Sequence, residues 1–259
     1  MKFSIITCTY NSARFLEKNL TSVLKQDFSD FEHIFIDGFS DDETVDMIKK
    51  YGNEQPYDVQ LFQIKPQGIS NAMNEGIRRA KGEYLMFLNS DDNFYTNDVL
   101  EKVDRVLVRQ KYDWIYGKIN VVEEHGKKIG VFPQKKIWQN DSTKWWGKYI
   151  LKFYNYVPHQ AVFMKKDVFL KYGFFDETLS SGMDPDLWLR VRKKTKWSFF
   201  DTIVSNYCIR SDSQSASKRN KSRTVSNWKK VQSRYLNFIE KIPAFILNML
   251  VEKKNKNYR

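Results

Sequence analysis

The chain has 259 residues, of which 41% are hydrophobic and 15% aromatic, so its composition supports a packed core and excludes a largely disordered protein. Its two cysteines, Cys8 and Cys208, are too few for a disulfide scaffold, which favours a reducing compartment. The net charge of +12 is concentrated in residues 218–259, which carry twelve Lys or Arg against two Glu. This distribution argues against a chain that binds nucleic acid over its whole surface.

Four strand–helix repeats are predicted in the first 110 residues. Short, β-branched apolar runs predict the strands, and apolar residues at helical spacing predict the helices between them. The expected strands are residues 3–7, 33–36, 59–62 and 84–88, and the expected helices are residues 12–24, 42–51, 68–80 and 96–109. This alternation predicts an α/β fold with a parallel sheet and helices on both of its faces.

The alternation ends after residue 110, and the remaining elements are predicted one by one. We expect a hairpin over 114–131 with its turn at 123–126, a strand at 161–164, a helix from 166, a helix over 184–192, a strand over 203–209 and two C-terminal helical segments separated near Pro243. The predicted organisation is a single domain over residues 1–215, with a mostly parallel sheet flanked by helices, followed by a basic helical extension over 216–259.

The sequence predicts no membrane span and no signal peptide. No segment reaches the roughly 18 consecutive apolar residues of a spanning helix, and the first residues lack a long apolar stretch, so we expect a cytoplasmic protein. In the basic tail, apolar residues recur at helical spacing beside lysines, as in an interfacial helix: Ile242, Phe245, Ile246, Met249 and Leu250. Two interpretations stay open. Residues 218–259 bind the anionic inner face of a membrane, or their apolar stripe packs on the main body.

Polar residues collect at the ends of the predicted strands. Thr9 and Asn11 follow the first strand, Asp37 follows the second, and the pair Asp91 and Asp92 follows the fourth. Ligands of open α/β sheets bind beyond the carboxyl ends of the strands, so we expect these residues to line a site. No Gly-x-Gly-x-x-Gly motif follows the first strand, which argues against a dinucleotide. Two adjacent acids after a buried strand favour a divalent cation, although a simple helix-capping turn is the alternative.

Several segments, in order along the chain, resemble motifs of glycosyltransferase family 2. They are residues 7–11 (TxxYN), 37–42 (DGSxD), 68–83 (GIxxAxNxGI followed by AxGE), 88–92 (DxD), 173–177 (GxFDE) and 183–190 (ED-x-DLWLR). The match spans residues 3–210 and is nearest to bacterial enzymes that build exopolysaccharide or the O-antigen of lipopolysaccharide. It implies a GT-A fold and inverting transfer of a hexose or N-acetylhexosamine from a UDP- or GDP-sugar to a hydroxyl of a lipid-linked glycan.

The resemblance also implies roles for individual residues. The donor nucleotide would contact Thr7, Thr9, Tyr10, Asn11, Asp37, Ser40, Asn71 and Asn89. Asp91, supported by Asp92, would hold Mn²⁺ or Mg²⁺, and Asp184 would be the general base. The chain departs from the family pattern at two positions: Asn89 replaces the first acid of DxD, and Met183 replaces the acid before Asp184.

Three residues are predicted to contact the acceptor: His159, Trp188 and Asp186. For His159 the alternative is a buried, hydrogen-bonded histidine, and for Trp188 it is packing in the core. Arg210, Ser213 and Ser215 lie where this family often has a loop over the diphosphate, and the alternative for them is a solvated linker.

Two other functions stay open on sequence grounds. A nucleotidyltransferase also combines a nucleotide-binding sheet with acids and a metal, but it would normally carry a glycine-rich phosphate loop, and residues 7–12 contain no glycine. A catalytically inactive protein that binds nucleotide sugars should have lost Asp91 or Asp184, and both are present. We expect a nucleotide-sugar donor and a glycan acceptor as partners, and no nucleic acid.

Overall fold

The structure, a computed structural model, describes residues 1–210, 218–242, 244 and 248. Its first half contains β1 (Phe3–Thr9), α1 (Ala13–Leu24), β2 (Phe31–Asp37), α2 (Thr44–Asn53), β3 (Asp58–Gln63), α3 (Ile69–Arg79), β4 (Tyr84–Phe87), β5 (Asn93–Phe94) and α4 (Val99–Gln110). Its second half contains β6 (Trp114–Glu123), β7 (Lys128–Phe132), η1 (Lys136–Trp138), α5 (Trp145–Ile150), η2 (His159–Ala161), β8 (Val162–Lys165), α6 (Lys166–Tyr172), α7 (Met183–Val191), β9 (Trp197–Ile209) and α8 (Lys218–Tyr235).

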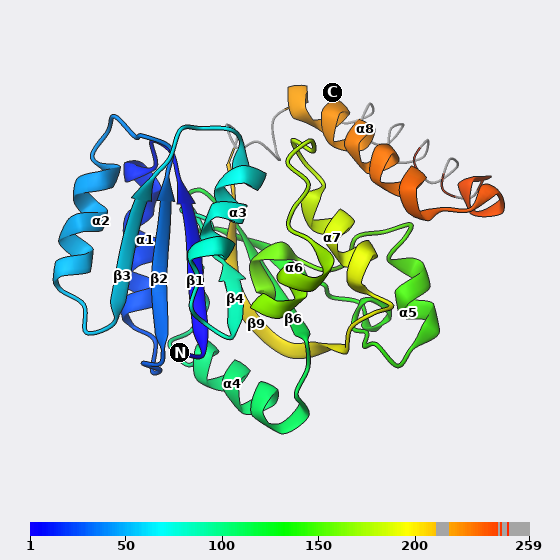
Figure 1. The fold of residues 1–259 in the computed structure, drawn as a ribbon, viewed down its shortest axis with the longest axis horizontal. Helices are drawn as coiled ribbons and strands as arrows, with labels where there is room; N and C mark the ends of the chain where they lie inside the picture. Colours follow the sequence, from blue (N-terminus) through cyan, green and yellow to red (C-terminus); the bar gives the residue numbers. More distant parts are fainter. Residues whose placement is uncertain (211–217, 243, 245–247, 249–259) are drawn as a thin grey trace.

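The strands of the described chain form one sheet in the order β3-β2-β1-β4-β8-β6-β9-β5, with β7 paired to β6. β1 is parallel to β2 and β4, and β2 is parallel to β3, which confirms the prediction from the strand–helix alternation. In the second half, β8 is antiparallel to β4 and β6, whereas β9 is parallel to β6. The carboxyl ends of the first four strands therefore meet at one edge of the sheet, which is the upper edge in Figure 1.

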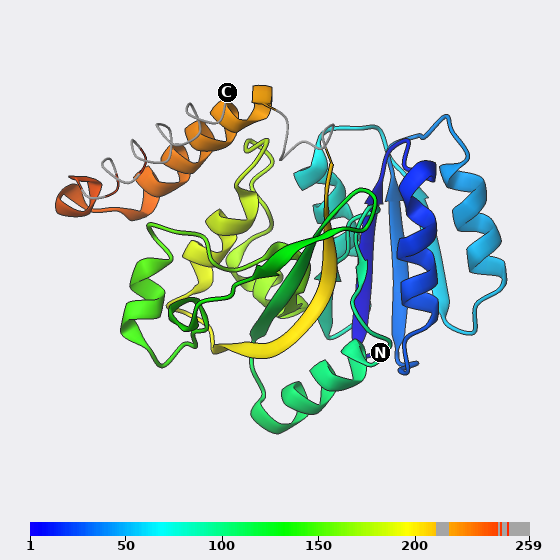
Figure 2. The ribbon, with the colours of Figure 1, turned by 180° about the vertical axis from the view of Figure 1, so that it is seen from behind.

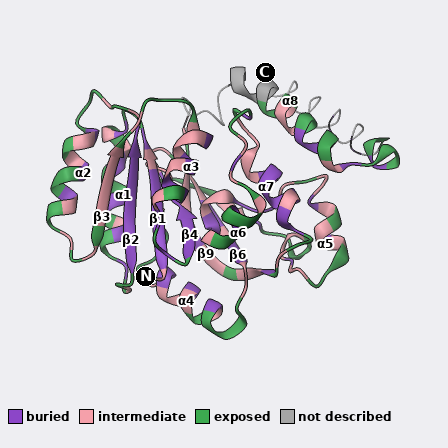
Figure 3. Ribbon diagram, in the orientation of Figure 1, coloured by how far each residue is buried: buried purple, intermediate pink, exposed green. Residues whose placement is uncertain are grey.

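Alternate residues of β1 supply the two faces of the sheet. Ile6 packs with Met73 and Ile77 of α3 on one face, whereas Ile5 packs with Val103 of α4 on the other. α3, α6 and α7 cover the first face, which is turned toward the viewer in Figure 1, and α1 lies on the opposite face in Figure 2. β1, β2 and β4, which lie between these layers, are almost entirely buried (Figure 3). The helices on both faces are as predicted.

Two strands, one in each half of the chain, differ from the expectation. β9 begins at Trp197 instead of residue 203, because the fully buried Trp197 ring stacks on Trp114 of β6 with 4.9 Å between ring centroids. The two-residue strand β5 is absent from the expectation, since it forms only by pairing with the distant Ser205 and Asn206 of β9. α4 consequently begins at Val99 and not at residue 96. The predicted hairpin is present as β6 and β7.

The C-terminal helix α8 packs on the body of the protein. Val231 is fully buried, and Trp228 and Tyr235 contact the same core cluster as Leu187 of α7. Figures 1 and 2 both show α8 running beside α7. The apolar face of α8 is therefore in the core, whereas both interpretations of the tail concern the later stripe from Ile242 to Leu250.

The second C-terminal segment begins after Leu236 and Asn237, where the helix is interrupted. The break predicted near Pro243 lies outside the described residues, and so do Phe245, Ile246, Met249 and Leu250. Ile242 is described and is 60% exposed. Within the described part of the chain, no helix has the length and apolar character needed to cross a membrane.

Candidate active site

Asp37, the last residue of β2, is the centre of the predicted nucleotide side of the site. It is fully buried and pairs in register with Thr9, the last residue of β1. Its Oδ1 accepts hydrogen bonds from Thr9 Oγ1 (2.9 Å) and Ser40 Oγ (2.5 Å). Its Oδ2 accepts from the backbone N–H of Ser40 (2.9 Å) and from Gln63 Nε2 (3.3 Å). Four donors hold this carboxylate, and the longest bond comes from an exposed side chain, that of Gln63.

Two loops meet at the carboxyl ends of β1 and β2, and each contains a residue with a left-handed backbone: Asn11 (φ 48°) and Phe39 (φ 59°). The backbone N–H of Asn11 donates to Ser40 Oγ (2.9 Å), which joins the loops. Tyr10 and Phe39 are 63% and 58% exposed. An aromatic residue rarely adopts such a backbone, and strain of this kind is concentrated at ligand sites.

Thr7 lies beneath the predicted nucleotide site and is fully buried. Its hydroxyl donates to the Leu88 carbonyl (2.8 Å) and therefore accepts from His33 Nε2 (2.9 Å). His33 Nδ1 lies 3.2 Å from the Tyr51 hydroxyl. Burial lowers the pKa of His33 to about 3, so this imidazole is neutral at physiological pH. Thr7 thus holds the backbone directly before the turn that carries Asp91.

The turn over residues 89–92 is tied to the elements around it. Asp92 is fully buried, its Oδ1 accepts from the backbone N–H of Cys208 (3.0 Å), and its Oδ2 accepts from Asn89 Nδ2 (2.9 Å). Asn19 of α1 donates to the carbonyl oxygens of Asn89 (2.9 Å) and Asp92 (3.2 Å). Burial, and then the charge of Asp91, raises the pKa of Asp92 well above its usual value. The pairing of two acids here is costly unless a cation is near.

Asp184 lies in the first turn of α7, which follows Gly182 at φ 80°, a backbone conformation that favours glycine. Its Oδ2 accepts a long bond from Asn155 Nδ2 (3.4 Å). Burial raises the pKa of Asp184 to about 6. Such a carboxylate is charged at neutral pH and is a better proton acceptor than an ordinary aspartate.

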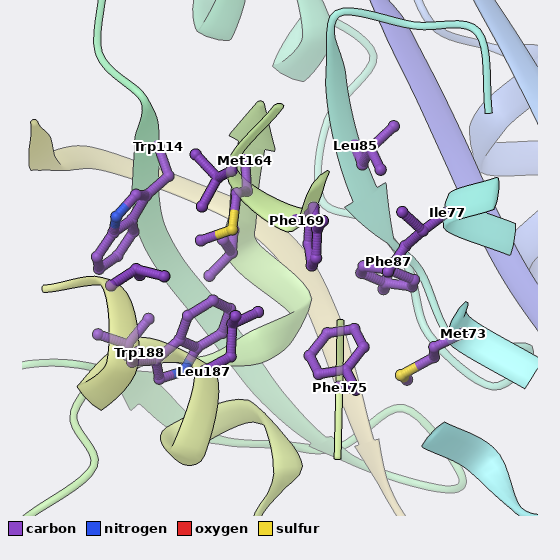
Figure 4. Close-up of a cluster of buried hydrophobic side chains, with 14 of the residues drawn as sticks. Met73, Ile77, Leu85, Phe87, Trp114, Met164, Phe169, Phe175, Leu187 and Trp188 are labelled. Atoms are coloured by element: carbon purple, nitrogen blue, oxygen red, sulfur yellow. The ribbon is translucent and has the colours of Figure 1, made fainter. Parts of the chain in front are cut away.

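Trp188, one turn further along α7, lies in the core. It is 1% exposed and stacks on Trp114 with 5.6 Å between centroids, among the buried side chains of Figure 4. This position favours packing over contact with an acceptor. The centroids of the His159 and Phe87 rings lie 5.3 Å apart. Neither nitrogen of His159 has a hydrogen-bond partner within the described residues. Burial lowers the pKa of His159 to about 4, so its ring is neutral.

The two remaining predicted residues connect elements around the site. Asn71 of α3 donates to Glu177 Oε2 (3.1 Å) in the loop between α6 and α7. Asp186 of α7 is 1% exposed, and its carboxylate pairs with Arg190 of the same helix and with Arg234 of α8. The structure therefore places Asp186 in the contact between α7 and α8.

The family model for glycosyl transferase family 2 matches residues 4–168, which is well over half of the chain. The chain belongs to glycosyl transferase family 2. The resemblance of the motifs is thereby confirmed, and with it the general prediction of a glycosyltransferase. The matched range contains Asp37 and Asp91 and ends before Asp184.

Curated relatives of this family 2 glycosyltransferase include the PGL/p-HBAD biosynthesis glycosyltransferase of Mycobacterium tuberculosis (strain ATCC 25177 / H37Ra). It is 28% identical over 208 residues, which cover 79% of this chain and 70% of the relative. The poly(ribitol-phosphate) beta-N-acetylglucosaminyltransferase TarS of Staphylococcus aureus (strain Mu50 / ATCC 700699) is 29% identical over 136 residues. These cover 52% of this chain and 24% of TarS.

Solved structures share the fold. The crystal structure of S. aureus TarS 1-349 in complex with UDP-GlcNAc has a TM-score of 0.69 at 19% identity, over 92% of this chain and 72% of that one. The mannosyltransferase PcManGT from Pyrobaculum calidifontis, in complex with GDP-Man and Mn²⁺, has a TM-score of 0.67 at 15% identity, over 88% of this chain and 63% of that one. The predicted GT-A fold is confirmed.

The acids of this glycosyltransferase fit a cation that shares its coordination with a substrate. Among the described residues, no three His, Cys, Asp or Glu side chains are grouped so as to hold a metal. Mg²⁺ sites, however, often use one or two carboxylates together with substrate phosphates. The Asp91 side chain is 15% exposed and already attracts a positive group, since Arg210 Nε lies 3.2 Å from its Oδ2. Ser213 and Ser215 lie outside the described residues.

Proposed function

We propose that the protein transfers a hexose or N-acetylhexosamine from a UDP- or GDP-sugar to a glycan hydroxyl, with inversion at the anomeric carbon. One observation carries the proposal. Three carboxylates lie in different environments. Asp37 ends β2, Asp91 lies in the turn after β4, and Asp184 lies in the first turn of α7. Asp37 is held by four donors, Asp91 attracts a cation, and Asp184 has a raised pKa. Carboxylates held in such different environments are typical of divided chemical roles.

Asp37 would recognise the nucleobase. Its four hydrogen-bond donors leave room for a base N–H only if one of them withdraws, and the long bond from the exposed Gln63 is the one to break. Thr9 and Ser40 would keep the carboxylate oriented. Tyr10, with its exposed ring, would lie against the base, and Asn11 would shape the loop. Thr7, Asn71 and Asn89 would support the same nucleotide, with Asn89 nearest the ribose.

Asp91, supported from behind by the buried Asp92, would hold Mn²⁺ or Mg²⁺ together with the diphosphate. The cation would neutralise the charge that develops on the departing diphosphate, an effect of several kcal/mol in order of magnitude. Two of the matched structures contain Mn²⁺ together with a nucleotide or nucleotide sugar, PcManGT with GDP-Man and GalNAc-T7 with UDP, and they support such a role.

Asp184 would act as the general base. The acceptor oxygen forms a bond to the anomeric carbon, the bond from that carbon to the diphosphate oxygen breaks on the opposite side, and the hydroxyl proton passes to an oxygen of Asp184. A general base contributes about 10²–10⁴ in rate. His159, Trp188 and Asp186 would shape the acceptor side, the last two from within the core.

We propose a glycan acceptor on a lipid carrier, in the synthesis of a bacterial surface polysaccharide such as O-antigen. The names of the mycobacterial relative and of TarS, which refer to PGL/p-HBAD biosynthesis and to poly(ribitol-phosphate), support a cell-envelope acceptor. The enzyme would work in the cytoplasm, against the inner membrane face. We propose residues 1–215 as the catalytic domain and 216–259 as its basic extension, whose exposed Phe238, Ile239 and Ile242 would contact the membrane.

A thermal-shift screen of UDP- and GDP-sugars with and without Mn²⁺ tests this function, followed by detection of the released nucleoside diphosphate with glycan acceptors. We expect one nucleotide sugar to stabilise the protein in a Mn²⁺-dependent way and to be consumed when an acceptor is present. Stabilisation by a nucleotide sugar without release of the nucleoside diphosphate, either to an added acceptor or to water, would indicate an inactive binding protein. Stabilisation by a nucleoside triphosphate, with release of pyrophosphate, would indicate a nucleotidyltransferase.

A further inference from the structure

The C-terminal helix α8 makes a specific polar contact with the helix that carries Asp184. Arg234 of α8 places Nη1 2.9 Å from Asp186 Oδ1 and Nη2 2.8 Å from Asp176 Oδ2. Asp186 belongs to the first turn of α7, as Asp184 does, and Asp176 belongs to the loop between α6 and α7. One guanidinium therefore bridges two segments that are separate in the chain, which its planar fork of donors allows.

The loop on the other side of this bridge is fastened to α3. Glu177, next to Asp176, accepts hydrogen bonds from Asn71 (3.1 Å) and Asn74 (2.8 Å). Asn74 also donates to the carbonyl of Phe175 (3.0 Å) and accepts from its backbone N–H (3.0 Å). A continuous set of contacts therefore runs from α3 through the loop to Arg234 and on to the first turn of α7.

Neutralising the charge of Asp186 does not require Arg234. Arg190, on the same helix, pairs with Asp186 Oδ2 at 2.6 Å, and the Tyr235 hydroxyl lies 3.1 Å from Oδ1. Arg234, the second cation beside Asp186, instead adds a link to Asp176. Removing it would leave Asp186 with a partner, so the particular contribution of Arg234 is geometric.

We propose that Arg234 is a positioning residue for sugar transfer, holding the first turn of α7, and with it Asp184, in register with the donor. The proposal rests on the function proposed above. A misplacement of about 1 Å of a reacting group can cost about 10² in rate, so even a small shift of this turn would lower turnover. The basic C-terminal extension would thus be a working part of the catalytic domain.

Three variants test the proposal, with two matched controls. Arg234→Met removes both ion pairs and keeps the length of the side chain, Arg234→Lys keeps the charge without the fork, and Asp176→Asn breaks only the link to the loop. Lys230→Ala removes an exposed charge from the same helix. Val231→Ala weakens the packing of α8, since Val231 is fully buried, but leaves the bridge intact.

We expect Arg234→Met to lower kcat by about tenfold or more while changing the affinity for the donor nucleotide by less than about twofold. Arg234→Lys and Asp176→Asn should fall between this variant and the wild type, and Arg234→Met combined with Asp176→Asn should be no slower than Arg234→Met alone. Val231→Ala should lower the melting temperature without lowering kcat. In hydrogen exchange, the amides of 183–191 should exchange faster in Arg234→Met than in Lys230→Ala.

An unchanged kcat in Arg234→Met and Asp176→Asn overturns the proposal. So does a loss of kcat in Val231→Ala equal to that in Arg234→Met, when the two variants have the same melting temperature. If Arg234→Met does not fold, Arg234→Lys and Asp176→Asn decide between these outcomes. A wild-type protein that transfers no sugar in the same assay overturns the proposed function instead. In that case the exchange of the α7 amides still shows whether Arg234 holds this helix.

Discussion

Arg210 Nε lies 3.2 Å from Asp91 Oδ2, so a protein cation stands beside the carboxylate that we assign to the metal. We predict that Asp91→Asn abolishes the gain in nucleotide affinity that Mn²⁺ provides. Loss of an outer-sphere partner of a metal typically costs about 10–100-fold in affinity, and loss of a ligand should cost at least as much. Calorimetry of UDP and GDP, with and without Mn²⁺, measures the effect. The control is Asp46→Asn, an exposed carboxylate on α2, and an unchanged metal-assisted affinity in Asp91→Asn contradicts the assignment.

The raised pKa of Asp184 predicts the pH dependence of transfer. The base must be deprotonated to accept the proton of the acceptor, and its pKa is about 6. We therefore expect kcat to be constant above about pH 7 and to fall about tenfold per pH unit below 6. Asp184→Asn should lower kcat by about 10² or more, should lack this acidic limb and should keep its affinity for the donor. Lost donor affinity with an unaffected single-turnover rate would make Asp184 a binding residue.

The burial of the Asp184 carboxylate also predicts that its charged form lowers the stability of the folded protein. Burial raises its pKa from 3.8 to about 6, so the folded state binds the proton more tightly than the unfolded state does. The stabilisation from the proton is complete below the unfolded-state value and is lost as the pH rises through 6. Asp184→Asn should therefore be more stable than the wild type at pH 8, by up to about 3 kcal/mol, and equally stable near pH 3.5. Urea unfolding at both pH values measures the difference, and an equal gain at both would exclude this origin.

Phe39 predicts a separation of stability from binding. Its φ of 59° suits glycine, and its ring is 58% exposed beside Asp37. Relief of the left-handed backbone is worth about 1–2 kcal/mol, partly offset by the greater freedom of glycine in the unfolded chain. We expect Phe39→Gly to be as stable as the wild type or slightly more stable, and to bind the nucleotide more weakly. Phe39→Tyr should retain the affinity. Undiminished binding in Phe39→Gly would show that the exposed ring beside Asp37 does not contribute to nucleotide binding.

The local pattern of the sequence was sufficient for β1 to β4. Each of these strands was expected from a short apolar run, and their parallel pairing follows from the helical connections between them. The pairing of β9 with β6 and β5 could not be predicted in this way, because it joins segments about 80 to 110 residues apart that share no local signal.

The strand ends in the sequence also located Asp37 and Asp91, but not their supports. Asn19 carried a signal, since it is a polar residue in a buried helix face with Leu16, Leu20 and Val23. Its amide holds the turn before Asp91. No sequence signal pointed to the contact of Arg234 with Asp186. Each residue alone resembles an ordinary helix-surface charge, and only the packing of α8 on α7 brings them together.

The exposed beginning of the second C-terminal segment provides the last prediction. Phe238, Ile239 and Ile242 are 83%, 76% and 60% exposed, and Lys241 lies among them. The surrounding segment 218–259 carries a net charge of +10. Insertion of each large apolar side chain is worth about 1.5–3 kcal/mol, and each basic residue near an anionic surface adds about 1 kcal/mol. We therefore expect binding to anionic vesicles at low salt, weakened as the salt concentration rises.

Truncation after residue 217 is a poor test of this binding, because it would also remove the buried Val231 and the contacts of Arg234. The triple variant Phe238→Ser, Ile239→Ser and Ile242→Ser leaves those contacts in place. In flotation with vesicles that contain anionic lipid, this variant should lose most of its binding while keeping its melting temperature and its turnover with a soluble acceptor. Val108→Ser, which alters a 61% exposed side chain on α4, should float like the wild type. If the triple variant also floats like the wild type, the exposed apolar residues 238, 239 and 242 are not the membrane contact.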